Sequence, residues 1–275
     1  MEAREYLREG RLDEALQAVQ EQVRKEPAVV RHRVYLFQLL SVLGQWGRAL
    51  NQLQLIGEMD AGALSMVQTY RETLQCETLR SEVFAGKRTP LVFGEPAPWL
   101  ALFLQALQHT AAGRHQAAQA TRAQALDQVE TTAGRLDGSE FLWLADADSR
   151  LGPVVEAIVN GHYYWIPFDR ISQIRLEAPE DLRDMVWMPA YFTWANGGKA
   201  AGFIPTRYPQ SEASGDPLLA LARKTCWTDN GSEEYVGSGQ RMLATDTGEF
   251  PLMAIREIIL QVTEEEPETQ AGGNG

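Results

Sequence analysis

The chain has 275 residues, 44% hydrophobic and 23% charged, which is typical of a folded soluble protein with room for two domains. Its formal net charge of −12 argues against nucleic acid as a partner, because phosphate binding needs a basic surface, and favours basic or amphipathic partner segments. No apolar run reaches the roughly 18 residues of a membrane span, and the charged start of the chain does not resemble a signal peptide. Because Cys76 and Cys226 belong to no CxxC pair, we expect a protein of the reducing cytoplasm. Since no apolar span is present, we expect no membrane partner.

The first half of the chain contains a helical repeat. Gly10 and Gly44 lie 34 residues apart, each is followed five residues later by alanine, and a third copy begins at Gly113. This is the period of tetratricopeptide repeats, in which a glycine ends one helix and a small alanine lets the next helix pack closely. Pro27 should stop the second helix of the first copy. We therefore predict a tetratricopeptide-like α-helical domain over residues 1–135, in preference to a generic stack of helical hairpins.

The first helix of each pair in such a stack lines a concave groove. If the register of the repeats holds, Arg31, Tyr35 and Gln38 face this groove, and Gln68 and Glu72 follow from the next pair. The groove is either a peptide-binding surface or a face that is solvated or filled by the C-terminal half of the chain. The sequence leaves these alternatives open.

A Pro- and Gly-rich loop at 86–98 is followed by a further helical segment that ends near Val129. After that segment the helical periodicity of apolar residues fades. Aromatic and β-branched runs then alternate with turn signals, and they predict strands at 140–146, 153–159, 162–171, 172–177, 185–195, 200–208, 240–246 and 250–260. The segment 140–146 is equally compatible with a last helical turn. A helix is expected at 216–225, where Asp216 provides an N-cap.

These segments predict a β-rich domain over residues 136–262, arranged as a partly open barrel or curled sheet of roughly four to six strands. The acidic, Gly-rich tail at 263–275 is expected to be disordered. The predicted fold class is α+β in two segregated parts: a tetratricopeptide-like helical stack followed by a small β-barrel-like curled sheet.

The Asn-Gly pair at 160–161 is the strongest hairpin signal in the chain. A two-residue turn puts Val159 opposite His162, and the alternate residues that follow His162 form an apolar face that should be core. Tyr163 and Trp165 point to the opposite, aromatic face. We expect the helices of the first half to cover that face, with a partner protein as the alternative.

The sequence contains no convincing catalytic constellation. Asp146 and Asp148 are spaced like metal carboxylates, but the other ligands and the glycine of a calcium loop are missing. Asp246 and Glu249 are better explained by a hairpin turn. The four histidines show no metal spacing, and the nucleotide-binding glycine motifs are absent. We expect a protein without cofactor or enzymatic activity; the alternative is a hydrolase or glycan-binding module whose four carboxylates converge in an aromatic cleft.

Five long motifs, at 7–16, 25–46, 144–171, 186–194 and 242–258, span both halves of the chain. Together they resemble the ImpE family, also called TagJ or SciE-type, of type VI secretion accessory proteins. The resemblance implies a cytoplasmic, non-enzymatic adaptor that binds the N-terminal helix of the small subunit of the contractile sheath. It also implies a link to the AAA+ unfoldase that recycles the sheath. A general tetratricopeptide scaffold without a sheath role remains the alternative.

The resemblance assigns no binding residues, so the candidate partner-binding side chains follow from geometry alone. They are Arg31, Tyr35, Gln38, Gln68, Glu72, Tyr163 and Trp165.

Overall fold

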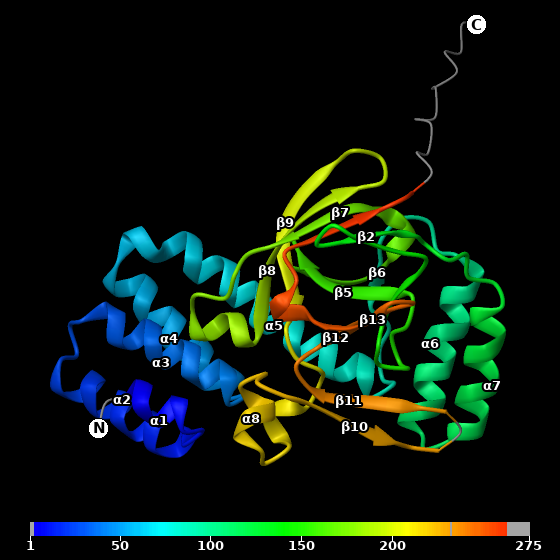
Figure 1. Cartoon of the computed structure of the whole chain (residues 1–275). Helices are drawn as coiled ribbons and strands as arrows, with labels where there is room; N and C mark the ends of the chain where they lie inside the picture. The colour runs from blue at the N-terminus through cyan, green and yellow to red at the C-terminus, as the bar shows by residue number, and fades with distance from the viewer. Residues whose placement is uncertain (1–2, 232, 263–275) are drawn as a thin grey trace, which may run out of the picture.

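The computed structural model describes residues 3–231 and 233–262, and the tail at 263–275 lies outside the described residues. The first half is a stack of helices (Figure 1). Its main helices are α1 (Ala3–Arg8), α2 (Leu12–Lys25), α3 (Val30–Val42), α4 (Trp46–Met59), α5 (Leu64–Phe84), α6 (Pro98–Ala111) and α7 (His115–Leu126). Helices α1–α4 lie at one end of the molecule and α6–α7 at the other.

Three helix pairs, α1–α2, α3–α4 and α6–α7, turn at the glycines of the repeat. Gly10, Gly44 and Gly113 have φ values of 75°, 66° and 69°, a conformation that glycine adopts without steric cost. Ala15 and Ala49 are fully buried, so their small side chains allow close helix packing. Helix α2 ends at Lys25, before the proline that was expected to stop it. The predicted helical stack is confirmed.

The second half forms a nine-stranded sheet in the order β1-β6-β5-β9-β8-β7-β14-β2-β3. All neighbouring strands are antiparallel except β1 and β6, which are parallel. The strands are β1 (Leu91–Val92), β2 (Gly134–Leu136), β3 (Ser139–Phe141), β5 (Val154–Val159), β6 (His162–Pro167), β7 (Ile171–Leu176), β8 (Trp187–Trp194), β9 (Lys199–Pro205) and β14 (Glu257–Leu260). Strands β1 and β3 form its two edges, so the sheet is open.

Two smaller sheets complete the fold. One contains β4 (Leu144–Asp146), β12 (Met242–Thr245) and β13 (Gly248–Pro251), and the other contains β10 (Thr225–Asp229) and β11 (Tyr235–Gly239). The predicted α+β class is confirmed, but the expected number of strands was too low. The missed strands are short. Strand β1 lies in the predicted loop at 86–98, β2 at the boundary of the two predicted domains, β10 begins at the end of the predicted helix, and β13 lies in the predicted hairpin turn.

The helix predicted at 216–225 is wrong in its length. Only α8 (Pro217–Ala220) is helical, and Asp216 caps it by accepting a hydrogen bond from the backbone N–H of Leu218. Ala222 then adopts a left-handed φ of 50°, which ends the helix, and β10 begins at Thr225.

The hairpin of β5 and β6 has the register that its Asn-Gly turn predicts. Val159 pairs with His162, and Ile158 pairs with Tyr163. The side chains of Ile166 and its alternate neighbours join a core between the large sheet and the sheet of β4, β12 and β13. His162, at the open end of the strand, is exposed rather than buried.

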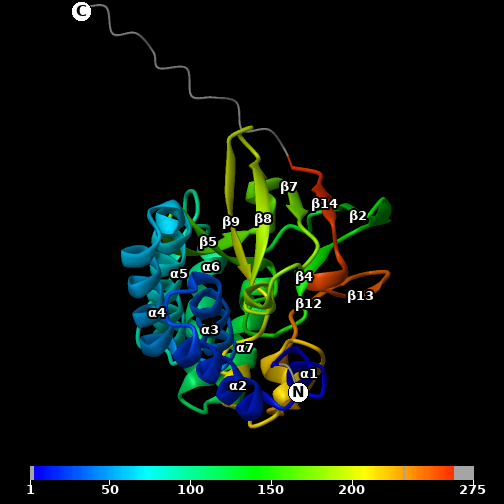
Figure 2. The same ribbon diagram turned by 90° about the vertical axis from the view of Figure 1, so that its left-hand side faces the viewer.

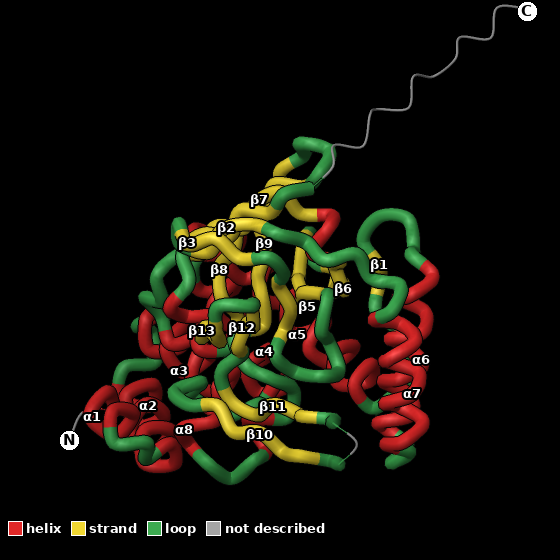
Figure 3. The backbone as a smooth tube through the Cα atoms, turned by 45° about the vertical axis from the view of Figure 1, so that its right-hand side comes forward, coloured by secondary structure: helices red, strands yellow, loops and turns green. Residues whose placement is uncertain are grey.

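The helices cover the other face of the hairpin. Tyr163 and Trp165 belong to the same buried cluster as residues of α3, α5 and α6. The ring centroid of Trp165 lies 5.9 Å from that of Phe84 on α5. Figure 2 shows helices α3, α4 and α5 along one side of the strands, and Figure 3 shows α6 and α7 beyond β1 and β6. The sheet therefore has a core on each face.

Candidate partner-binding site

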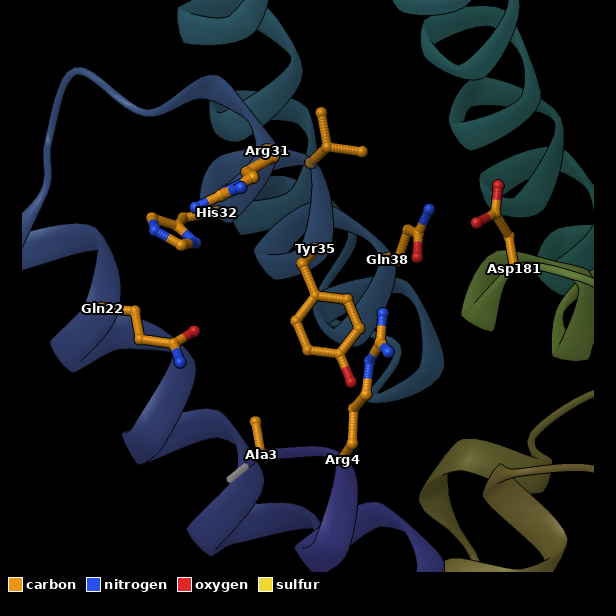
Figure 4. A pocket seen from close by; sticks show the side chains of 9 residues that line it. Ala3, Arg4, Gln22, Arg31, His32, Tyr35, Gln38 and Asp181 are labelled. Carbon is orange, nitrogen blue, oxygen red and sulfur yellow. The ribbon is translucent and has the colours of Figure 1, made fainter. Parts of the chain in front are cut away.

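A cavity of about 310 Å³ opens between α1, α2 and α3 (Figure 4). We call it the α1–α3 cavity. Its lining residues are Ala3, Arg4, Gln22, Arg31, His32, Val34, Tyr35, Gln38 and Asp181. The volume is at the low end of ligand pockets, which measure about 300–1,000 Å³. It suits a few side chains of a docked segment better than a large cofactor.

Helical spacing brings the side chains of α3 into this cavity. Arg31, Tyr35 and Gln38 are separated by four and three residues, so they lie on one face of the helix. The opposite face of α3 is buried in the core, where Phe37 and Leu40 are almost fully covered. The hydrophobic core therefore fixes which face of α3 lines the cavity.

The Tyr35 ring points into the cavity, and the Arg4 guanidinium lies beside its hydroxyl group. Burial raises the pKa of Tyr35, and Arg4 partly offsets that rise. The ring is half-buried and Gln38 is only 5% exposed, whereas Arg4 and Arg31 are exposed. The cavity therefore combines the Tyr35 ring and the buried Gln38 amide with guanidinium donors at its rim.

The connector before β8 occupies part of the predicted concave groove. It contains the short 3₁₀ helix η3 (Leu182–Met185), which contacts α3. The Arg183 guanidinium lies 4.8 Å from the centre of the Tyr70 ring on α5. The groove expected from the repeat is therefore not continuous, because the C-terminal half of the chain fills its middle.

Gln68 and Glu72 lie together on α5, away from the α1–α3 cavity. The amide of Gln68 donates a hydrogen bond of 2.5 Å to the Glu72 carboxylate. Glu72 lines a separate cavity of about 350 Å³ beside Gly161 at the tip of the β5–β6 hairpin. The structure thus brings Arg31, Tyr35 and Gln38 together but does not join these two residues to them.

Tyr163 and Trp165 are buried and not available to a partner, so the prediction that they bind one is wrong. They are 1% and 0% exposed because α5 packs over them. The Tyr163 hydroxyl donates to the Glu156 carboxylate, and the Trp165 indole N–H donates to the Tyr163 hydroxyl at 2.8 Å. Both aromatic residues are internal parts of the junction between the helices and the sheet.

The four carboxylates of the hydrolase alternative do not form a common pocket. Asp146 and Asp148 are buried and accept hydrogen bonds from arginine side chains. Asp246, in the turn between β12 and β13, and Glu249, in β13, are exposed, and Asp246 accepts a hydrogen bond from a backbone N–H. The arrangement that this alternative requires is therefore absent.

Asp146 is instead part of a buried ionic cluster between the helices and the sheet. Arg80 of α5 donates to both oxygens of Glu156 at 2.6 and 3.0 Å, and Arg241 donates to Glu156 and to Asp146. Burial alone would raise the pKa of Glu156, but Arg80 and Arg241 outweigh it and lower the pKa to about 2. No local sequence pattern predicts this cluster, although Glu156 in the middle of an apolar strand is a visible signal.

Within the described residues, no helix is long and apolar enough to cross a membrane, and no group of three or more His, Cys, Asp or Glu side chains could hold a metal ion.

The chain is therefore an α+β protein in which a helical-repeat stack covers one face of an open sheet. A small cavity lies between the first helices of the stack. The family model described as ImpE protein matches residues 138–259. The type VI secretion system accessory component TagJ of Pseudomonas aeruginosa is 51% identical over 264 residues, which cover 96% of this chain and 92% of that protein. The chain therefore belongs to the ImpE family, the family of TagJ.

A solved structure has the same fold. The X-ray structure of protein VPA1032 from Vibrio parahaemolyticus matches with a TM-score of 0.86 and covers 95% of this chain and 98% of that chain. The two sequences are 20% identical, so this likeness shows the fold alone.

Proposed function

We propose that this chain is a cytoplasmic accessory component of a type VI secretion system. The name of its relative from Pseudomonas aeruginosa supports this role, because the identity of 51% extends over both the helical and the β-rich parts. Within that apparatus, the chain acts as a non-enzymatic adaptor that binds the N-terminal helix of the small sheath subunit. It links the sheath to the AAA+ unfoldase that recycles it.

The α1–α3 cavity is the proposed binding site of the sheath helix. One observation carries this proposal: Arg31, Tyr35 and Gln38 line the same cavity. The register of the repeat had predicted that these three residues share one face. An amphipathic helix recognises a groove through apolar side chains spaced along one face. Tyr35 and Val34 supply the apolar contact, and the guanidinium of Arg31 supplies a hydrogen-bond donor for polar or acidic side chains beside it.

The test is a titration of the purified chain with a synthetic peptide of the N-terminal helix of the small sheath subunit. Tyr35→Ala and Arg31→Glu should each raise the Kd about tenfold or more, because central aromatic and arginine contacts dominate such interfaces. Gln68→Ala, at an exposed position on α5 outside the cavity, is the matched control and should leave the Kd unchanged. Circular dichroism of each variant establishes that it is folded.

Two results would count against this proposal. If both cavity variants bind the peptide as tightly as the unmodified chain does, the seat is elsewhere. If the unmodified chain binds no sheath component, the adaptor role itself is wrong.

A further inference from the structure

A second cavity, of about 380 Å³, lies at the other end of the molecule from the α1–α3 cavity. It opens between the first turn of α6, the end of α7, β4 and the end of β6. We call it the α6–β4 cavity. Aromatic and aliphatic side chains dominate its lining, among them Trp99, Leu126, Trp143 and Phe168.

The mouth of the α6–β4 cavity exposes large apolar side chains. Leu126 is 50% exposed and Trp143 is 37% exposed, and the adjacent Leu142 is 70% exposed. Isolated exposed apolar residues are ordinary on protein surfaces, but a group of them around an apolar hollow marks a binding site. Trp143 and Leu126 therefore form an anchoring surface that the fold itself leaves uncovered.

Acidic residues line and flank this apolar surface. Glu130 and Asp169 are the charged residues among those that line the cavity, and both are exposed. Asp127 is exposed next to Leu126. The charged side chains at the mouth are therefore acidic, which favours cationic side chains in an occupant.

This charge also argues against two other occupants. The tail of the chain, 263–275, contains four glutamates and neither a basic residue nor a large apolar one, so it has nothing to insert and would be repelled. A second copy of the chain carries a net charge of −12 of its own. Neither is complementary to an apolar cavity with an acidic rim.

We propose that the α6–β4 cavity is a second docking site, for a basic amphipathic segment of a partner protein. An aromatic or leucine side chain of that segment inserts between Trp99 and Trp143. Its lysine or arginine side chains face Glu130 and Asp127. This site is separate from the α1–α3 cavity, so the chain can hold two different segments at the same time, as an adaptor requires.

The test uses a synthetic probe, a helical peptide of about 14 residues, or roughly four turns, with Leu and Trp on one face and Lys on the other. A peptide with Glu in place of every Lys is its counterpart. Fluorescence anisotropy should show that the chain binds the basic peptide at least about tenfold more tightly than the acidic one. The preference should decrease with salt, because surface charges are screened.

Substitutions at the cavity mouth locate the binding. Trp143→Ala and Leu126→Ser should each raise the Kd for the basic peptide about tenfold, whereas Trp143→Phe should retain binding. Tyr191→Ala removes a similarly exposed ring on β8 and should have no effect. Tyr35→Ala should also have no effect, and this control distinguishes failure at the α1–α3 cavity from failure here.

Two outcomes would overturn the proposal. The first is a Kd that neither Trp143→Ala nor Leu126→Ser changes, or equal binding of the two peptides. The second is concentration-dependent dimerisation, measured by sedimentation, that these substitutions abolish, because it would assign the cavity to a second copy of the chain.

Discussion

Glu156 is a carboxylate in the middle of an apolar strand, and it is fully buried between two guanidinium groups. The sequence marks it as an anomaly. Its partners Arg80 and Arg241 lie 76 and 85 residues away in the chain, and no local pattern connects them. Single residues that break a pattern can therefore be found from the sequence, whereas their partners follow only from the fold.

Glu156 should make the stability of the protein sensitive to acid. Its pKa is lowered in the folded state, so its stabilising contribution is present above the unfolded value of 4.5 and is lost as the pH falls toward about 2. Glu156→Gln should decrease the free energy of unfolding near pH 7 by on the order of 3 kcal/mol, because it leaves buried guanidinium groups poorly paired. The difference from the unmodified chain should shrink between pH 4.5 and pH 2.

Denaturant unfolding at a series of pH values measures this difference. Glu140→Gln is the control, since Glu140 makes an exposed ion pair with Arg135 that contributes little. Parallel pH profiles for Glu156→Gln and the unmodified chain would contradict the assignment.

Among the elements, the hairpin of β10 and β11 is attached to α6 and α7 chiefly through Glu234. Glu234, in the turn of this hairpin, is buried and accepts hydrogen bonds from Thr110, His115 and Arg122 of α6 and α7. The neighbouring Glu233 is exposed and makes only a long contact of 3.4 Å with Gln119. Adjacent glutamates thus have different roles.

Glu234→Gln should decrease the free energy of unfolding by about 3 kcal/mol, because it breaks a buried ion pair with Arg122. Glu233→Gln is the matched control and should change it by less than about 0.5 kcal/mol. Thermal or urea unfolding measures both. Equal effects of the two substitutions would mean that Glu234 does not hold the hairpin against α6 and α7.

Elements that carry a turn motif or a repeat in their own sequence could be predicted, and short strands without such a pattern could not. The Asn-Gly turn at 160–161 correctly gave the register of β5 and β6, and the glycine period correctly gave the helix pairs. Strand β1 has only two residues and pairs with β6, which lies far along the chain. The alternation of residues in β6 predicted that Tyr163 and Trp165 share one face of the strand. Which helix covers that face, α5, follows only from the fold.

At the scale of the whole molecule, the helical half and the sheet half are joined by buried polar contacts. Arg207 donates to the carbonyl oxygens of Ser41 and Val42 at the end of α3, and the Trp187 indole donates to Glu77 of α5 at 2.9 Å. The division at residue 135 into two domains stays a prediction. The interface itself explains why the predicted continuous groove is divided: the segment before β8 fills the middle of it.

Only those residues of the candidate site that share one face of a single helix could be predicted from the sequence. Arg31, Tyr35 and Gln38 follow from the repeat register, and one cavity brings them together. The α6–β4 cavity could not be predicted, because Trp99, Leu126, Trp143 and Phe168 come from four separate segments. Two cavities at opposite ends of one molecule fit an adaptor that holds two segments.

The central claim is that the α1–α3 cavity seats the N-terminal helix of the small sheath subunit. Photo-crosslinking tests it most directly, with p-benzoylphenylalanine incorporated in place of Tyr35 and, as a control, in place of the exposed Leu55 on α4. A crosslink from position 35 to that helix, located by mass spectrometry, is expected, and none from position 55. A crosslink from position 55 alone, or none from position 35 while the complex forms, would contradict it.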